Sequence, residues 1–193
     1  MGKRAEQKEK QRQNLLDVSL DLFVRRGYHG TTVRDIAEKA DISVGLVFHY
    51  FPTKQAILEE LATLASVGTS LARDLLAAPF PPLHIFEQIV EMSFQYLEEP
   101  AASRLFLLVN QINTLESIPE QIKQLVSSQE AVRASIPLIL KGQHLGEIKQ
   151  GDPWSLTLAF WGAIQGIAEM RLWVPDAPVP DVQCIVDLLK VSR

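Results

Sequence analysis

The side chains that could carry out catalysis are scattered along this chain. The four histidines are isolated from one another and from the single cysteine, and there is no Gly-rich phosphate loop, GxSxG or HExxH motif. The paired carboxylates Glu59-Glu60 and Glu98-Glu99 are adjacent, so on a helix they would diverge rather than share a face. We therefore expect no enzymatic activity, no cofactor and no metal site.

Residues with functional spacing lie instead between Thr32 and Phe51, in the run TVRDIAEKADISVGLVFHYF. Thr32 offers a capping hydroxyl, and apolar residues then recur at helical spacing. Asp41 stands where the chain must turn, and Asp tolerates the left-handed backbone conformation. Ser43 can cap a second helix over residues 44–50. Two short helices around a tight turn predict a helix-turn-helix, a motif that places its second helix in the major groove of DNA.

A longer run, Gly27 to Lys54 (GYHGTTVRDIAEKADISVGLVFHYFPTK), resembles the amino-terminal domain of the tetracycline-repressor (TetR/AcrR) family of transcription regulators. The shared features are the glycine that ends the first helix, the Thr-Thr pair, the DIA core, the Ser and Gly of the second short helix, the aromatic cluster and the lysine that follows. The resemblance over residues 56–193 is weaker and depends mainly on the order of helices and breaks.

The resemblance implies which residues contact double-stranded DNA: Thr32, Arg34, Ser43, Val44, Gly45, Leu46, Phe48, His49, Tyr50 and Lys54. The chain departs from many relatives at Val44, where they have a basic or polar residue, and at Phe48, where they have tyrosine. Apolar contact with thymine methyl groups is a mode of base readout that fits this departure. Two milder interpretations remain: the hydroxyls could serve only as helix caps, and the two aromatic side chains, Phe48 and Tyr50, could pack against the first helix.

Composition and charge set the limits for this interpretation. The chain has 193 residues, is 47% hydrophobic and carries a net charge of -4. Residues 1–55 hold ten Lys/Arg against seven Asp/Glu, or +3, and residues 56–193 hold nine against sixteen, or -7. This asymmetry favours nucleic-acid binding by the amino-terminal part. No apolar run could span a membrane and no signal peptide is evident, so we expect a cytoplasmic protein with no membrane partner.

The pattern predicts an all-α fold of about nine helices. Residues 9–69 would form a helix-turn-helix DNA-binding domain with its motif at 32–51, and residues 70–193 a larger domain for effector binding and dimerisation. Besides the motif, apolar periodicity, glycines and prolines predict helices at 11–26, 53–78, 83–99, 101–113, 119–141 (with a kink or break at Pro137), 154–173 and 181–191.

The last two predicted helices have more apolar surface than a small domain can cover, which indicates a partner subunit. Gly162 and Gly166 are four residues apart, so a second backbone could approach them closely. In similar proteins these helices pair as a four-helix bundle. The expected interface of a homodimer comprises Trp161, Gly162, Gly166, Val182, Ile185 and Leu189.

An effector pocket is expected among the helices that follow residue 82. Small-molecule sites are mostly apolar with a few polar groups, and this region is rich in aromatic residues. Ordinary core packing is the alternative for each of them. The residues expected to line the pocket are Phe94, Phe106, Asn110, Trp154 and Trp161.

These observations predict a sequence-specific transcriptional regulator. A repressor released from a palindromic operator by a small apolar or amphipathic effector is the leading hypothesis. The alternative is a helical protein-interaction adaptor that keeps the helix-turn-helix without binding DNA.

Overall fold

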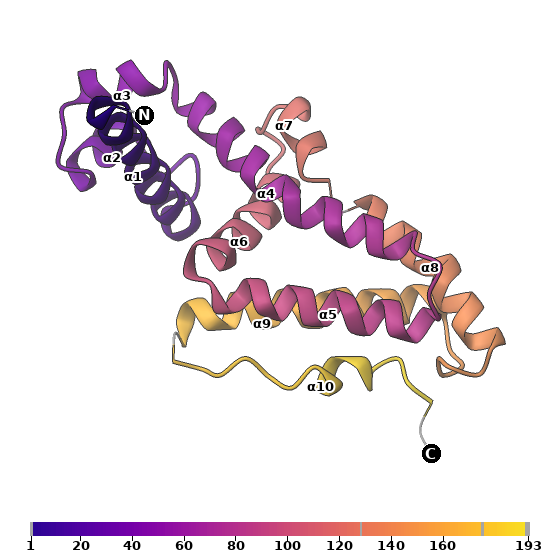
Figure 1. The fold of residues 1–193 in the computed structure, drawn as a ribbon. Helices are drawn as coiled ribbons and strands as arrows, with labels where there is room; N and C mark the ends of the chain where they lie inside the picture. The colour runs from indigo at the N-terminus through magenta and orange to yellow at the C-terminus, as the bar shows by residue number, and fades with distance from the viewer. Residues whose placement is uncertain (1, 128, 175, 192–193) are drawn as a thin grey trace. The chain divides into compact units, whose positions relative to one another are not determined.

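The computed structural model describes residues 2–127, 129–174 and 176–191 (Figure 1). Within these ranges it has ten helices and no strand, with one isolated β-bridge between Ile148 and Lys190. The all-α prediction is confirmed, with one helix more than the nine expected. The helices are α1 (Lys3–Arg26), α2 (Val33–Lys39), α3 (Val44–Tyr50), α4 (Lys54–Leu76), α5 (Pro82–Glu98), α6 (Pro100–Thr114), α7 (Glu120–Leu125), α8 (Gln129–His144), α9 (Pro153–Trp173) and α10 (Gln183–Val186).

Contacts divide the chain into two compact units. Unit 1 comprises Met1–Ser66 and Leu107–Val126, and unit 2 comprises Val67–Phe106 and Ser127–Arg193. Two helices, α4 and α6, therefore contribute residues to both units. The sequence predicted one boundary after residue 69. In the structure the first boundary falls near that point, after Ser66 within α4. Residues 107–126 also belong to unit 1, which the sequence did not predict.

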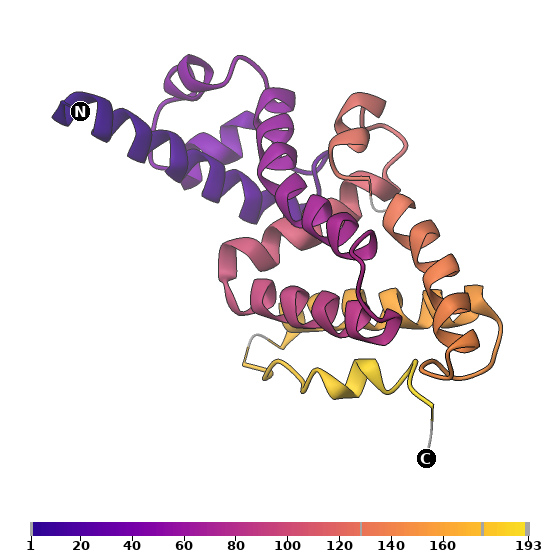
Figure 2. The same ribbon diagram turned by 45° about the vertical axis from the view of Figure 1, so that its right-hand side comes forward.

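Unit 1 is built around an apolar stripe on α1. Leu16, Leu20 and Phe23 are fully or almost fully buried, as the helical spacing predicted. The helix begins eight residues earlier than expected, at Lys3 rather than Gln11. Its first turns consist largely of Lys, Arg, Glu and Gln, which have high helix propensity, so the helix extends without core beneath it. Figure 2 shows this part of α1 projecting from the rest of the unit.

Unit 2 is held together by α5, α8 and α9. The rings of Phe86 on α5 and Phe160 on α9 meet edge to face, with centroids 4.9 Å apart, and both side chains are fully buried. Helix α9 packs most extensively against α8. It is apolar on most sides, so packing against α5 and α8 does not use all of its apolar surface.

Two of the predicted helices differ from the structure. The helix expected at 119–141 is two helices, because the backbone leaves helical geometry at Val126 (φ -122°, ψ 20°), whereas Pro137 lies inside α8. The helix expected at 181–191 shrinks to the four residues of α10, followed by turns. The chain then pairs with the 148–149 segment, where the amide of Lys149 donates to the carbonyl of Leu189 (2.8 Å).

Candidate nucleic-acid interface

The first helix of the motif, α2, starts with a reciprocal cap. The amide of Asp35 donates to the hydroxyl of Thr32 (3.1 Å), and the amide of Thr32 donates to the carboxylate of Asp35 (2.7 Å). Hydrogen bonds from the side chain and backbone of Thr32 lower the pKa of Asp35 below its ordinary value. The predicted cap is confirmed, and Thr32 remains exposed at the surface.

The turn of the motif has the geometry that its residue types favour. Asp41 adopts the left-handed conformation (φ 54°), and in the described part of the chain it is the only residue other than glycine with positive φ. The amide of Ile42 donates to the carbonyl of Ala37 (3.0 Å), which closes the turn. Ser43 then caps α3 by accepting from the amide of Leu46 (3.2 Å).

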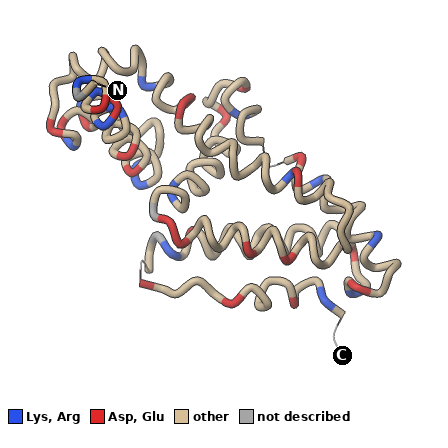
Figure 3. The backbone as a smooth tube through the Cα atoms, in the orientation of Figure 1, with Lys and Arg blue, Asp and Glu red and all other residues tan. Residues whose placement is uncertain are grey.

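Helix α3 has one buried face and one exposed face. Val47 and Phe51 are buried against the rest of unit 1, as predicted. Leu46 is 36% exposed and Phe48 is 48% exposed, and Gly45 and His49 are also exposed. Helix α3 contains no Lys, Arg, Asp or Glu, so Figure 3 draws it in tan throughout. Phe48 is therefore not a core residue, while Tyr50 is half-buried with its ring against His49.

Lys54 has structural partners that the sequence did not predict. Its ammonium donates to the carbonyls of Tyr28 and Thr31, both at 2.7 Å, and lies 4.2 Å from the centroid of the Tyr28 ring. Desolvation in this half-buried position lowers the pKa of Lys54, against the opposing effect of Asp35. An ammonium has three donors, so two carbonyl bonds leave at most one for the predicted phosphate contact.

Further polar contacts hold the end of α1 against its neighbours. The hydroxyl of Thr31 donates to the carbonyl of Gly27 (3.0 Å), and the side-chain Nε2 of Gln111 donates to the carbonyl of Val24 (3.0 Å). Asp21 on α1 pairs with Lys39 at the end of α2. Sequence reasoning missed these tethers, because their partners lie up to 87 positions apart and no local pattern connects them.

The residues expected to line an effector pocket have different environments. Within unit 2, Phe94 is buried, Phe106 is half-buried, and Trp161 donates its indole N–H to the hydroxyl of Ser135 (3.0 Å). Trp154 is exposed. Asn110 belongs to unit 1. These five residues therefore differ in burial, and they do not all belong to one unit.

Two polar groups of unit 2 that the predicted set omitted are candidates for effector contact. The Nε atom of Arg104 and the hydroxyl of Thr157 are buried, and neither has a hydrogen-bond partner among the described residues. Buried polar groups are normally paired, so these two atoms could pair with a ligand. Thr157 is a single threonine among apolar residues near the start of α9, and no sequence pattern distinguished it from an ordinary helix residue.

The predicted dimer interface needs correction at its carboxyl-terminal end. Ile185, on α10, which packs against α5 and α9, and Leu189, beyond α10, are buried in their own protomer, so they have almost no surface for a partner. Trp161 is half-buried and hydrogen-bonded to α8. In unit 2 the exposed large apolar residues on α8, on α9 and directly after them are Leu140, Leu145, Trp154, Leu158, Met170, Trp173 and Val174. Others lie elsewhere in the unit: Val67, Leu71, Phe80 and Val191.

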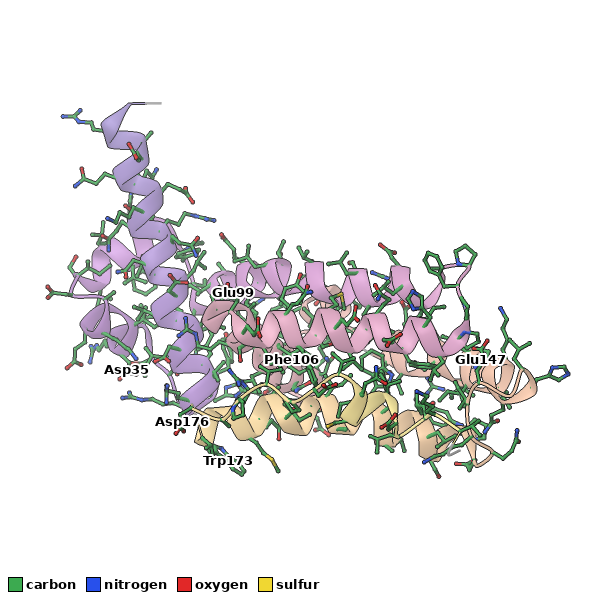
Figure 4. All side chains as sticks on the ribbon, turned by 60° about the horizontal axis from the view of Figure 1, so that its bottom comes forward. Asp35, Glu99, Phe106, Glu147, Trp173 and Asp176 are labelled. Atoms are coloured by element: carbon green, nitrogen blue, oxygen red, sulfur yellow. The ribbon has the colours of Figure 1, made fainter. Side chains whose placement is uncertain are left out.

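Gly162 lies on this exposed part of α9, and a Cβ atom added at Gly162 or Gly166 would meet no atom within 4 Å. Figure 4 shows the labelled Trp173 side chain at the carboxyl end of the same helix, where it is 79% exposed. Both α8 and α9 therefore leave apolar side chains exposed. Val182 of the predicted set is half-buried.

Among the described residues, no cluster of His, Cys, Asp or Glu could hold a metal ion, and no helix has the length and apolar character needed to cross a bilayer.

Comparisons with known proteins agree with the geometry of unit 1. Residues 15–61 match the family model described as bacterial regulatory proteins, tetR family. The transcriptional regulator RutR of Escherichia coli (strain K12) is 27% identical over 179 residues, which cover 87% of this chain and 78% of RutR. The transcriptional repressor KstR2 of Rhodococcus jostii is 43% identical over 54 residues, 28% of this chain and 26% of KstR2.

The fold extends the similarity beyond the motif. The solved structure of the ketosteroid transcriptional regulator KstR2 of Mycobacterium tuberculosis superimposes with a TM-score of 0.72 at 18% identity, covering 94% of this chain and 95% of that chain. At this identity the structural match supports the fold alone, while the family model and the sequence relatives carry the assignment. The chain belongs to the tetR family of helix-turn-helix transcriptional regulators.

Proposed function

We propose that this chain binds double-stranded DNA through the exposed face of α3 and regulates transcription. The observation that carries the proposal is the pair of capped helices α2 and α3. In this arrangement Val47 of α3 is buried, while Leu46 and Phe48 of the same helix are exposed to solvent. A second helix presented in this way is the element that enters the major groove. Binding to chromosomal DNA would place the protein in the cytoplasm.

Phosphate contacts would come from the edges of the motif. Arg34 is exposed on α2, and the hydroxyls of Thr32 and Ser43 lie at the starts of α2 and α3. In its cap the Ser43 hydroxyl only accepts, so its own proton can be donated to a phosphate. The Thr32 hydroxyl donates to the Asp35 carboxylate and would have to turn away from it to donate to a phosphate. These contacts would position α3 without reading sequence.

We infer that the protein acts as a homodimer through α8 and α9. They leave Leu140, Leu158 and Met170 exposed, side chains that a second copy would cover, and a two-fold axis would present two copies of α3 to two half-sites of a palindrome. The half-sites would then be separated by about one turn of DNA, or about 34–36 Å.

We infer further that unit 2 binds a small apolar or amphipathic effector that releases the DNA, so that the protein acts as a repressor. The buried, unpaired polar atoms of Arg104 and Thr157 support a ligand with at least one polar group. Phe94, Phe106 and Trp161 would supply apolar contact. The effector can lower operator affinity only as far as it binds the DNA-released conformation more tightly than the DNA-binding one. Each 1.4 kcal/mol of difference between these two binding free energies changes operator affinity about tenfold.

A salt titration with DNA from the region flanking the protein's own gene tests the proposal. A DNA-binding dimer should bind tightly at low salt and lose affinity steeply as salt rises, because each neutralised phosphate releases counterions. Random duplex of the same length is the control, and it should bind more weakly. A helical adaptor that does not bind DNA would show no complex with either duplex even at 50 mM salt.

A further inference from the structure

The exposed face of α3 lacks the side chains that usually read base edges. Direct readout relies mainly on Arg or Lys with guanine and on Asn or Gln with adenine. The whole helix, VGLVFHY, contains none of these four residue types. His49 is the one exposed side chain of α3 with a ring nitrogen that could hydrogen-bond to a base. The remainder of the exposed surface is apolar or is backbone at Gly45.

The apolar side chains on this face are not part of the core of unit 1. Phe48 is nearly half exposed, whereas Val47, the residue before it, is buried. Leu46 is also exposed and Val44 is half-buried. A Cβ atom added at Gly45 would have a single neighbour within 4 Å, the Ser43 hydroxyl oxygen at 3.9 Å. Another molecule could therefore approach the backbone closely at Gly45, which lies between Val44 and Leu46 in the sequence.

The size and rim of this surface favour DNA over a protein partner. Helix α3 has only seven residues, and the exposed apolar side chains share it with His49. The exposed hydroxyl of Ser43 lies at the start of α3, and the exposed Thr32 and Arg34 lie at the start of α2, which packs against α3. A polar rim of this kind suits phosphates on either side of a groove. The apolar feature that the major groove offers to such a surface is the C5-methyl group of thymine.

We propose that the chain selects its operator chiefly through thymine methyl groups, contacted by Phe48, Leu46 and Val44. The proposal deepens the DNA-binding function and depends on it. Each methyl group buried against an apolar side chain adds about fourfold to affinity, by the usual value for a buried methylene. Specificity at these positions would therefore depend on a methyl group rather than on a hydrogen-bonded base edge.

The test begins with duplexes selected by the full-length chain from a random-sequence pool. Each thymine of the selected site is replaced, one at a time, by deoxyuridine, which keeps every hydrogen-bonding group and removes only the methyl. Affinity should fall about fourfold at each contacted position and stay unchanged elsewhere. Selected duplexes that tolerate deoxyuridine at every position would overturn the inference while leaving DNA binding intact.

The converse substitution restores the methyl group on a different base. At a sensitive position, changing the T·A pair to C·G should weaken binding, and 5-methylcytosine in place of that cytosine should recover about fourfold. Failure of 5-methylcytosine to recover any affinity at every sensitive position would mean that the lost methyl group acts through the shape of the duplex rather than through contact with a side chain, and the inference would be wrong.

Protein variants assign the contact to a residue. In Phe48→Ala, the penalty for deoxyuridine at one thymine should disappear, because the side chain that contacted the methyl is gone; Leu46→Ala should remove it at a different thymine. Phe80→Ala is the matched control, since Phe80 is 50% exposed and lies in unit 2, and it should keep every deoxyuridine penalty. If deoxyuridine cost each variant the same affinity at every thymine as it costs the unaltered protein, the assignment of methyl groups to Phe48 and Leu46 would be contradicted. A chain that selects no duplex would instead contradict the DNA-binding function itself.

Discussion

The two units of this protein are stabilised in different ways. In unit 1 a small core is surrounded by polar tethers: the Thr32–Asp35 cap, the Lys54 ammonium on two carbonyls and the Asp21–Lys39 pair. In unit 2 long helices pack apolar faces against one another, with Phe86 and Phe160 at the centre. Short helices bury little area, so the orientation of α2 and α3 depends on specific hydrogen bonds.

Both units also leave apolar side chains in solvent, and the surroundings indicate different partners. The exposed face of α3 belongs to a helix of seven residues that begins at the capping hydroxyl of Ser43. The exposed apolar residues of α9 lie between Trp154 and Trp173, in a helix of 21 residues. A surface of that length can pack against another helix, whereas the face of α3 fits a groove. Exposure alone does not identify the partner.

Replacing Leu158 on α9 by glutamate should have the largest effect. Leu158 is 59% exposed, so the protomer should still fold, but the carboxylate would be buried in a dimer formed through α8 and α9. We expect monomers by sedimentation and a loss of at least about 100-fold in operator affinity, because two linked heads bind far more tightly than one. Leu64→Glu, at an exposed site on α4 in unit 1, is the control and should remain dimeric. Normal dimers in Leu158→Glu would exclude this interface.

Lys54→Ala tests the tethers of unit 1. It leaves two carbonyls, of Tyr28 and Thr31, without their charged donor, and we expect the free energy of unfolding to fall by about 2 kcal/mol. Urea denaturation measures this loss. Gln55→Ala, at the next position of the same helix, should cost less than about 0.5 kcal/mol because its side chain is exposed.

The same variant addresses the phosphate contact predicted for Lys54. If the remaining N–H contacts a phosphate, the slope of log affinity against log salt should decrease in magnitude by about 1 under conditions where the variant is folded. An unchanged free energy of unfolding would contradict the structural role, and an unchanged salt slope would contradict the phosphate role. The two outcomes are independent.

Sequence reasoning succeeded where the signal is local. The cap at Thr32, the left-handed Asp41 and the inward direction of Val47 follow from residue type and spacing within a few positions. The helix break at Val126 was missed because Pro137 suggested a break further on, yet proline is accommodated inside α8. Helix α1 was predicted too short, because periodicity detects only its buried part.

Sequence reasoning failed where a role depends on distant contacts. Ile185 and Leu189 form an apolar stripe that fits a partner subunit as well as the protomer's own core, and only the fold distinguishes the two. Lys54 lies in the family motif, which indicates DNA contact, but its hydrogen bonds to Tyr28 and Thr31 cross more than 20 positions. A sequence pattern assigns a residue to a face and cannot name the atoms opposite.

Gly162→Ala sharpens the contrast between a free and a covered helix face. In a monomer the added methyl meets no atom within 4 Å, and alanine should stabilise the helix by about 1 kcal/mol. In a dimer with close backbone approach at α9, the same methyl should weaken association at least about fivefold. Measuring Gly162→Ala alone and in the Leu158→Glu background separates the two effects. Gly68→Ala on α4 is the control for helix propensity, and tighter dimers in Gly162→Ala would contradict close approach at this position.

The smallest expected effect concerns the Asp21–Lys39 pair and is visible in its pH dependence. Partial burial of the Asp21 carboxylate opposes ionisation, but the hydrogen bonds and charges of Lys39 and Arg25 outweigh it, so the pKa of Asp21 lies below its ordinary value of 3.8. A lowered carboxylate pKa stabilises the fold above the unfolded-state value, and that stability is lost as the pH falls through the folded-state pKa. Asp21→Asn should therefore cost up to about 1 kcal/mol at pH 7, since Lys39 and Arg25 are largely exposed, and much less at about pH 3.

Urea denaturation of both proteins at the two pH values measures this difference, and Asp17→Asn is the control on the same helix. Asp17 accepts a hydrogen bond from Gln13 at 3.4 Å, a long contact with a neutral donor, so its replacement should change stability little at either pH. An Asp21→Asn penalty that is equal at pH 7 and pH 3 would mean that packing of the side chain, rather than its charge, connects α1 to α2. In that case the small helices of unit 1 would be oriented by shape, as those of unit 2 are, and the distinction between polar tethers and apolar packing would not hold at this contact.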